Sequence, residues 1–500
     1  MRIKNFNKFF LFLVVSLAAC GGGGSGSLPP GDKGSAGLSQ IAPPALESAV
    51  QIELSQSPSA AHEARRLQQW LMSSDFSATG LYAPPLAKLH VRVEGALDKG
   101  VAKAYLLIGT YSRYHNYTWT PQEVELQVGD NNITASAEGG LVYIRYIGES
   151  PPFDTHKLTF TFDRGFIKAP RYVLGTTSAN DWAQQLATRT ASPDVVMESR
   201  RTIMVFSRSN ALKWRSYDQD FVLRTADTVA DAEDAISGLD GRGPQHTRNP
   251  HKILMTEAPA AYTLDLGAGA YAFDYRVAFS PHNLTGAFTP AIAGDAAEPH
   301  NTAWGTWHEL GHLHQQHWTW DSMAEVTVNI YSLAAQRALG VGLPAYSTDQ
   351  ALVARVKAYL AKPALEKNFN DESVGPFVRL YMLRQLWNVF GDGFFQTLHR
   401  ETRESPPEFA NDAARMRYFM LKACTISGKN LSAFFKTWGL PASESVYTEI
   451  DKLGLPLPAV DPSTMIDAPT GLAPEGLHNP AKTLSQFVRD LVLMTGLFAE

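Results

Sequence analysis

Residues 307 to 333 read WHELGHLHQQHWTWDSMAEVTVNIYSL, and this segment constrains the chain more than any other. Its first part contains the pattern HExxH, formed by His308, Glu309 and His312. Positions four apart lie on one face of a helix, so His308 and His312 can each direct an imidazole nitrogen at one metal ion. Glu309 lies one step round the helix, where its carboxylate can reach a metal-bound water without being a ligand.

A third ligand must come from outside the motif. Zinc suits two imidazoles and one carboxylate, with an open position for water. Glu325 follows His312 with twelve residues between them and begins the helical run EVTVNIYSLAAQRAL. Because a helix is a rigid mount for a ligand, we expect two helices joined by the turn WTWDS, with Glu325 completing the site.

Three nearby residues compete with this assignment. His314 lies two positions beyond the motif, on the opposite side of a helix, and His317 also falls off the ligand face. Asp321 lies in the expected turn. The long metzincin pattern would need a Gly and a further His where this chain has Gln315 and Trp318, so that class is excluded.

Four other residues are candidates for a supporting role. Asn329 lies one turn beyond Glu325 and could hydrogen-bond a ligand; helix packing is its alternative role. Trp304, Trp318 and Trp320 surround the motif. Aromatic faces stack on sugar rings, so we consider all three as contacts for a glycosylated substrate, with packing around the metal helices as the alternative.

The segment WGTWHELGHLHQQHWTW followed by EVTVNIYSL resembles the enhancin-like zinc metallopeptidases, a family of viral enhancins and bacterial mucin-degrading enzymes. Further blocks resemble the β-rich N-terminal portion of that family and its C-terminal helical signature. Together the blocks extend over about residues 78 to 456. They are ATGLYAPP (78–85), LLIGTYS (106–112), EGGLVYIRY (138–146) and SGKNLSAFFKTWGLPAS (427–443).

The resemblance implies one zinc ion per chain, with His308, His312 and Glu325 as ligands and Glu309 as the general base that activates a zinc-bound water. It also implies an endopeptidase that cleaves mucin-like O-glycoproteins. The residue that stabilises the developing oxyanion stays open among three candidates: His282, His300 and Tyr331.

Two other functions are compatible with the sequence. The first is a glycan-binding surface adhesin with a vestigial metal site. The intact Glu309 argues against it, since a site kept for binding alone has no need of a base. The second is a general surface protease that requires no glycan on its substrate.

The N-terminus indicates export. Basic residues at positions 2, 4 and 8 precede the apolar stretch FFLFLVVSLAA, which is too short to span a bilayer comfortably. The stretch ends in LAAC, which resembles the lipobox of bacterial lipoproteins. We therefore expect lipidation of Cys20 and attachment to the outer membrane or cell surface, with an ordinary secretory signal as the alternative. The following GGGGSGS is typical of a flexible tether.

Composition excludes several classes of protein. Hydrophobic residues make up 44% of the chain and charged residues 19%, as in an ordinary soluble globular protein. The net charge is −5 and no long basic run is present, so nucleic acid is not an expected partner. Cys20 and Cys424 are the only cysteines, so lipidation of Cys20 would leave no pair for a disulfide.

We expect an α+β multidomain chain: an N-terminal β-sandwich followed by a mostly helical catalytic domain of the zincin type. Strand-like alternation with Gly, Asn, Asp and Pro turns runs from 77 to about 175. The run AYAFDYRVAF is expected to form strands beside the cleft. The expected divisions are a signal peptide (1–20), linker (21–45), helical lead-in (46–76), β-sandwich (77–200), catalytic domain (201–457) and a tail with an amphipathic helix (458–500).

Overall fold

The computed structural model describes residues 46–465, except 47, 98–99, 110–120, 154–155, 259–268, 295–301 and 342–349. The expected signal peptide, Cys20, the linker 21–45 and the amphipathic part of the tail lie outside the described residues. Among those described, no helix is both long enough and apolar enough to cross a bilayer.

The N-terminal part is a β-sandwich. In β4 the alternation of KLHVRVEG turns Leu89, Val91 and Val93 inward, where they join Phe160 and Phe162 of the neighbouring strand in the sandwich core. This first, antiparallel sheet has the order β1–β9–β4–β7. Its strands are β1 (Val50–Ser55), β9 (Lys157–Arg164), β4 (Lys88–Gly95) and β7 (Gly129–Thr134).

The second sheet is buried on both faces. One face packs on the first sheet, and the other, which includes Leu107 and Tyr143, packs on a third sheet through Ile203 and Val205. The order is β10–β3–β8–β5–β6, with β2 paired to β8. The strands are β10 (Ile167–Lys168), β3 (Ser77–Ala83), β8 (Gly140–Gly148), β5 (Ala102–Gly109), β6 (Gln122–Leu126) and β2 (Ser57–Pro58).

The third sheet packs on the sandwich with one face and carries helices on the other. Met204, Phe206 and Met255 project from its other face into the largest core, where Val222 and Leu310 of two helices meet them. Its mixed order is β11–β12–β13–β14–β16–β15, which leaves β15 at an edge. The strands are β11 (Arg171–Val173), β12 (Asp194–Glu198), β13 (Thr202–Ser207), β14 (Ile253–Glu257), β16 (Arg276–Phe279) and β15 (Ala270–Phe273).

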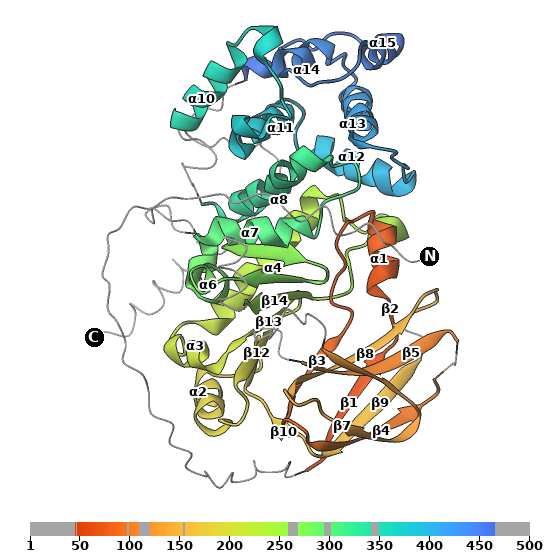
Figure 1. Ribbon diagram of the computed structural model, residues 1–500, viewed down its shortest axis with the longest axis vertical. Helices are drawn as coiled ribbons and strands as arrows, with labels where there is room; N and C mark the ends of the chain where they lie inside the picture. The colour runs from red at the N-terminus through yellow and green to blue at the C-terminus, as the bar shows by residue number, and fades with distance from the viewer. Residues whose placement is uncertain are drawn as a thin grey trace, which may run out of the picture.

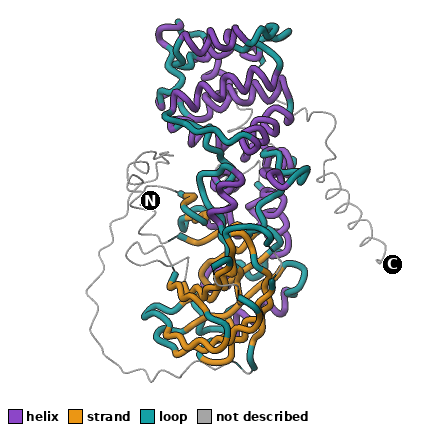
Figure 2. Tube along the Cα trace, turned by 90° about the vertical axis from the view of Figure 1, so that its right-hand side faces the viewer, coloured by secondary structure: helices purple, strands orange, loops and turns teal. Residues whose placement is uncertain are grey.

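Helices make up the rest of the molecule, and the C-terminal ones form a separate layer farthest from the sandwich (Figures 1 and 2). Near the third sheet lie α2 (Ala179–Thr188), α3 (Arg208–Lys213), α4 (Gln219–Ile236), α6 (Leu284–Phe288), α7 (Thr302–His312) and α8 (Ala324–Leu339). The outer layer contains α10 (Gln350–Leu360), α11 (Pro376–Phe390), α12 (Asp392–Glu404), α13 (Asp412–Ser427), α14 (Ser432–Trp438) and α15 (Glu444–Lys452).

The α+β fold class, with a β-sandwich before a mostly helical part, is confirmed. Within the expected helical lead-in, only Ala60–Leu67 is a helix (α1); Val50–Ser55 is instead β1 of the sandwich. The expected division at residue 200 falls inside the third sheet, between β12 and β13, because these strands form an antiparallel hairpin.

Candidate metal centre

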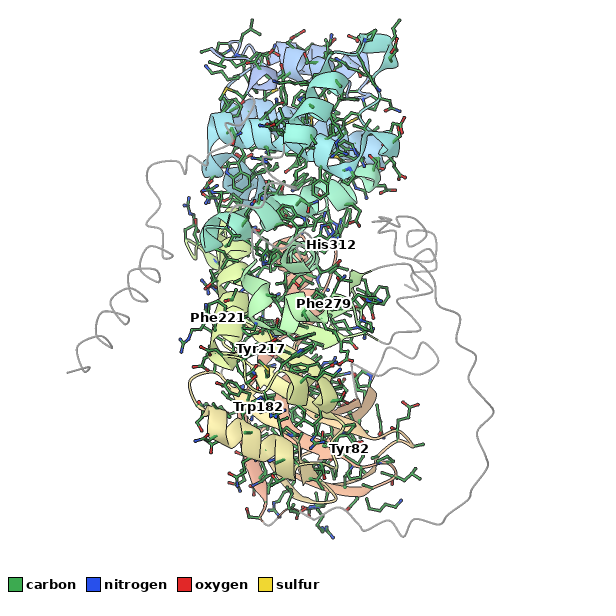
Figure 3. All side chains as sticks on the ribbon, turned by 90° about the vertical axis from the view of Figure 1, so that its left-hand side faces the viewer. Tyr82, Trp182, Tyr217, Phe221, Phe279 and His312 are labelled. Carbon is green, nitrogen blue, oxygen red and sulfur yellow. The ribbon has the colours of Figure 1, made fainter. Side chains whose placement is uncertain are left out.

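The HExxH motif forms the end of α7, and α8 follows after a short aromatic turn. The two helices lie between the third sheet and the outer helices, and His312 occupies this middle level of the molecule (Figures 1 and 3). They approach each other closely at Gly311. A Cβ built there would lie 2.9 Å from the carbonyl oxygen of Val328 and 3.1 Å from Cβ of Tyr331. Glycine at this position therefore permits the spacing of the two helices.

Three side chains meet between these helices. Nε2 of His308 lies 2.9 Å and Nε2 of His312 lies 3.7 Å from the same carboxylate oxygen of Glu325. One ligand atom from each residue lies within 4.8 Å of the other two. Zinc bonds of about 2.0–2.1 Å in a tetrahedron place ligand atoms about 3.3 Å apart, so this donor set fits a zinc ion.

Asn329 orients His308. Its Nδ2 donates to the main-chain oxygen of Glu325 at 2.9 Å, and its Oδ1 faces Nδ1 of His308 at 3.0 Å. The indole N–H of Trp304 donates to the same Oδ1 at 3.1 Å. An amide oxygen can only accept, so Nδ1 of His308 carries a proton, and Nε2 is the nitrogen that faces Glu325 and is available to a metal.

Gln315 does the same for His312, a role that the sequence analysis missed. Its Oε1 lies 2.7 Å from Nδ1 of His312, while its Nε2 donates to the main-chain oxygen of Ala324 and to Oγ1 of Thr327. The available signal was the position of Gln315, three residues beyond His312. The same position, where a metzincin has Gly, excludes the metzincin pattern but does not by itself indicate a contact with His312.

Glu309 lies beside these three side chains and is buried, with 8% of its surface exposed. Burial raises the pKa of its carboxyl group to about 7, an effect that His308 and the main-chain N–H of Ala272 oppose. Ala272 belongs to the edge strand β15. The carboxylate is thereby held at the border between α7 and that edge.

The charges of His308, His312 and Glu325 strongly affect one another. Burial lowers the pKa of His308, but the hydrogen bond and charge of Glu325 raise it by more, to about 9. Burial alone would raise the pKa of Glu325, and the two imidazoles instead hold it at about 2. Two imidazoles around one carboxylate therefore form a site at which a cation competes with a proton.

The competing ligands point elsewhere. His314 is buried beside Glu233, with Nε2 at 3.4 Å from that carboxylate. The side chain of Asp321 lies in a 3-10 turn near Asp412 and Arg415. Neither residue belongs to the cluster of His308, His312 and Glu325, which is the one group of potential metal ligands found among the described residues.

The expectation that tryptophans contact a glycan is wrong for Trp304, Trp318 and Trp320, because their side chains are at most 4% exposed. Each indole N–H donates to a protein group, namely Asn329, Gln316 and Asn370 respectively. These tryptophans pack around α7 and α8, and their hydrogen bonds hold neighbouring side chains in place. A sequence alone does not reveal which ring faces are covered.

Two of the three candidates for an oxyanion donor can be placed. The hydroxyl of Tyr331 is buried and lies 2.8 Å from both the main-chain oxygen of His314 and Nε2 of His399, so it is already engaged away from the cluster. His282 is exposed in the turn before α6. His300 lies outside the described residues.

Sequence comparison agrees with this geometry. The profile of the family described as peptidase M60, enhancin and enhancin-like matches residues 165–439, and that of the N-terminal domain of M60-like peptidases matches residues 58–160. The first match alone spans more than half of the chain. The chain belongs to the enhancin-like peptidase family. Residues 165–439 therefore have the fold of the peptidase M60 family, which the metallopeptidase ZmpB of Clostridium perfringens shares.

Curated relatives are longer than this chain. The putative lipoprotein YghJ of Escherichia coli is 25% identical over 457 residues, which cover 79% of this chain and 28% of that protein. Human TRPM8 channel-associated factor 2 is 26% identical over 299 residues, covering 58% and 30%. The chain thus spans less than a third of the length of these relatives.

Solved structures share the fold. A conserved Bacillus anthracis protein of unknown function has a TM-score of 0.70 and 28% identity, with 83% of this chain and 80% of that chain covered. The catalytic domain of ZmpC from Clostridium perfringens, solved with the sialyl T antigen, has a TM-score of 0.67 and 18% identity, with 86% and 85% covered.

Gly311→Ala should destabilise the protein, because the added methyl group meets the backbone of α8. We expect a loss of about 1–3 kcal/mol from overpacking, reduced by about 0.5–1 kcal/mol from the better helix propensity of Ala. Denaturant-induced unfolding measures it. Gly305→Ala is the matched control, since its Cβ would meet open space on the same helix. This control should stabilise the protein; equal shifts for both variants would contradict the close-approach argument.

Proposed function

We propose that the chain is a zinc endopeptidase with His308, His312 and Glu325 as ligands and Glu309 as the general base. The supporting observation is the meeting of two Nε2 atoms and one carboxylate oxygen within 4.8 Å, beside a buried Glu309. When bound, zinc would polarise the scissile carbonyl and make water nucleophilic near neutral pH. The side chains around the zinc would carry out the proton transfers.

Glu309 would take a proton from the attacking water and return it to the leaving amine. A base works best when its pKa lies near the working pH. Burial moves the pKa of Glu309 in that direction. The N–H of Ala272 holds the carboxylate next to β15, an edge strand suited to an extended peptide. Proton acceptor and substrate backbone would then lie side by side.

Two variants separate the ligands from the base. His308→Ala should lose most of the metal, because a site with two protein ligands is weak. Glu309→Gln should keep one zinc per chain but lose hydrolysis by about 10²–10⁴-fold, since the amide has the size of the base without its basicity. Metal analysis and casein cleavage, with and without a chelator, measure both.

Wild-type protein that stays free of zinc after metal loading would contradict the proposal. A Glu309→Gln variant that cleaves at the wild-type rate would exclude Glu309 as the base. Zinc binding without any hydrolysis by the wild type, on casein or mucin, would favour the glycan-binding adhesin instead.

For the substrate we propose mucin-like O-glycoproteins. The support comes from structural neighbours solved with O-glycan antigens: the sialyl T antigen on ZmpC and the Tn antigen on another metallopeptidase of the same fold. A glycan bound away from the scissile bond would supply binding energy that positions the peptide. The buried tryptophans contribute nothing to this argument, so other side chains must contact the sugar.

One defined peptide, with and without its O-glycan, tests the glycan requirement. We expect faster cleavage of the glycosylated form and slower cleavage after enzymatic removal of the glycan. Mass spectrometry of the products gives both the rates and the bond cleaved. Equal rates on the two forms would favour a general surface protease without a glycan requirement.

We also propose attachment to the outer membrane or cell surface through a lipid on Cys20. The LAAC sequence and its Gly-rich tether support this, as do relatives named lipoproteins. The Cys20→Ser protein should be absent from the membrane fraction or remain an unprocessed precursor. Cell fractionation, together with labelling by a fatty acid, measures both. Wild-type protein that takes up no label would instead have an ordinary signal peptide.

A further inference from the structure

We propose that Gln315 is a positioning residue of the metal centre. It fixes the ring orientation of His312 and, at the same time, the distance between α7 and the first turn of α8. This rests on the proposed zinc site. The side chain is buried, with 2% of its surface exposed, and its amide makes three hydrogen bonds.

The orientation of the Gln315 amide follows from its neighbours. Nε2 lies 2.6 Å from the main-chain oxygen of Ala324, which can only accept, so this atom must be the amide nitrogen. Nε2 also lies 2.8 Å from Oγ1 of Thr327, whose own proton goes to the main-chain oxygen of Met323 at 3.1 Å. Thr327 therefore accepts from Gln315. Both donors of the amide are committed to α8.

The other end of the amide then determines the state of His312. Oε1 of Gln315 can only accept, so Nδ1 of His312 must carry the proton in the contact at 2.7 Å. Nε2 of His312 is left with a lone pair directed toward Glu325, 3.7 Å away. Gln315 thus selects the ring tautomer that can bind a metal.

The anchor points of Gln315 give it a second effect. Ala324 is the residue before Glu325, and Thr327 lies in the same turn of α8. A side chain that begins three residues after one ligand is thus tied to the backbone directly beside another. The two bonds to α8 are therefore the ones through which the Gln315 amide holds the start of α8 beside the end of α7. The third bond, to His312, stays within the α7 side.

Gln315→Met tests the proposal, since methionine has a similar length and lacks both donors and the acceptor. We expect zinc affinity to fall about 10–100-fold, the usual effect of removing a partner of a metal ligand. Competition with a chelator measures the affinity. In the cobalt-substituted protein, the visible absorption bands should also change, because they report ligand geometry.

Gln316→Met is the matched control. Gln316 is the adjacent residue, is 1% exposed, and also makes three hydrogen bonds: to the main-chain oxygens of Leu67 and His399 and from Trp318. None of these partners is a ligand. Its replacement should cost stability to a similar degree but keep the zinc affinity and the cobalt spectrum of the wild type.

The outcomes are distinct. A folded Gln315→Met variant with wild-type affinity and spectrum would overturn the proposal, as would equal losses of affinity in both Met variants. If Gln315→Met does not fold, Thr327→Val decides: it removes one anchor of the amide, and unchanged zinc affinity in that variant would overturn the proposal. Wild-type protein that binds no zinc would overturn the proposed function itself, and the role of Gln315 with it.

Discussion

The structure depends on the close approach of α7 and α8 at Gly311. Without that approach, the imidazoles of α7 and the carboxylate of α8 could not lie within 4.8 Å of one another. The third sheet supports this helix pair from one side: Leu310 and Ile330 lie in the same core as Met204 and Phe206 of β13. The β-sandwich in turn supports that sheet through Ile203 and Val205. The helix pair thus packs on the third sheet, and the third sheet packs on the sandwich, so each layer holds the next in place.

Burial of polar groups makes the helix pair specific as well as close. The side chains of His308 and His312 are only 17% and 15% exposed, so a ring nitrogen without a partner would cost about 1–3 kcal/mol. Asn329 and Gln315 supply those partners, one for each ring. Both amides are anchored on α8. The correct arrangement of the two helices is therefore the one in which Nδ1 of each imidazole has its amide partner.

Much of this was predictable because its determinants are local. The i, i+4 spacing of His308 and His312 needs only a helix, and the period-two pattern of KLHVRVEG needs only a sheet with one buried face. The role of Gln315 was much harder to predict, because its position three residues beyond His312 is the one signal. It depends on how the turn 313–323 brings the start of α8 beside the end of α7. A single glutamine also has no periodic spacing in the sequence that would indicate its partners. β1 was missed for a similar reason: its partner β9 lies a hundred residues further along the chain.

The tryptophans illustrate the limit of composition as evidence. Trp304, Trp318 and Trp320 lie close to the ligands in sequence, and a sugar-binding face was a reasonable expectation. The structure uses them to fill the space behind the helices, where Trp318 stacks on Phe419 of α13. The open side of the centre is instead at Glu325, whose side chain is 42% exposed. For the proposed peptidase we therefore expect the substrate to approach on the side where Glu325 is exposed, and glycan recognition is to be sought on the surfaces that border it.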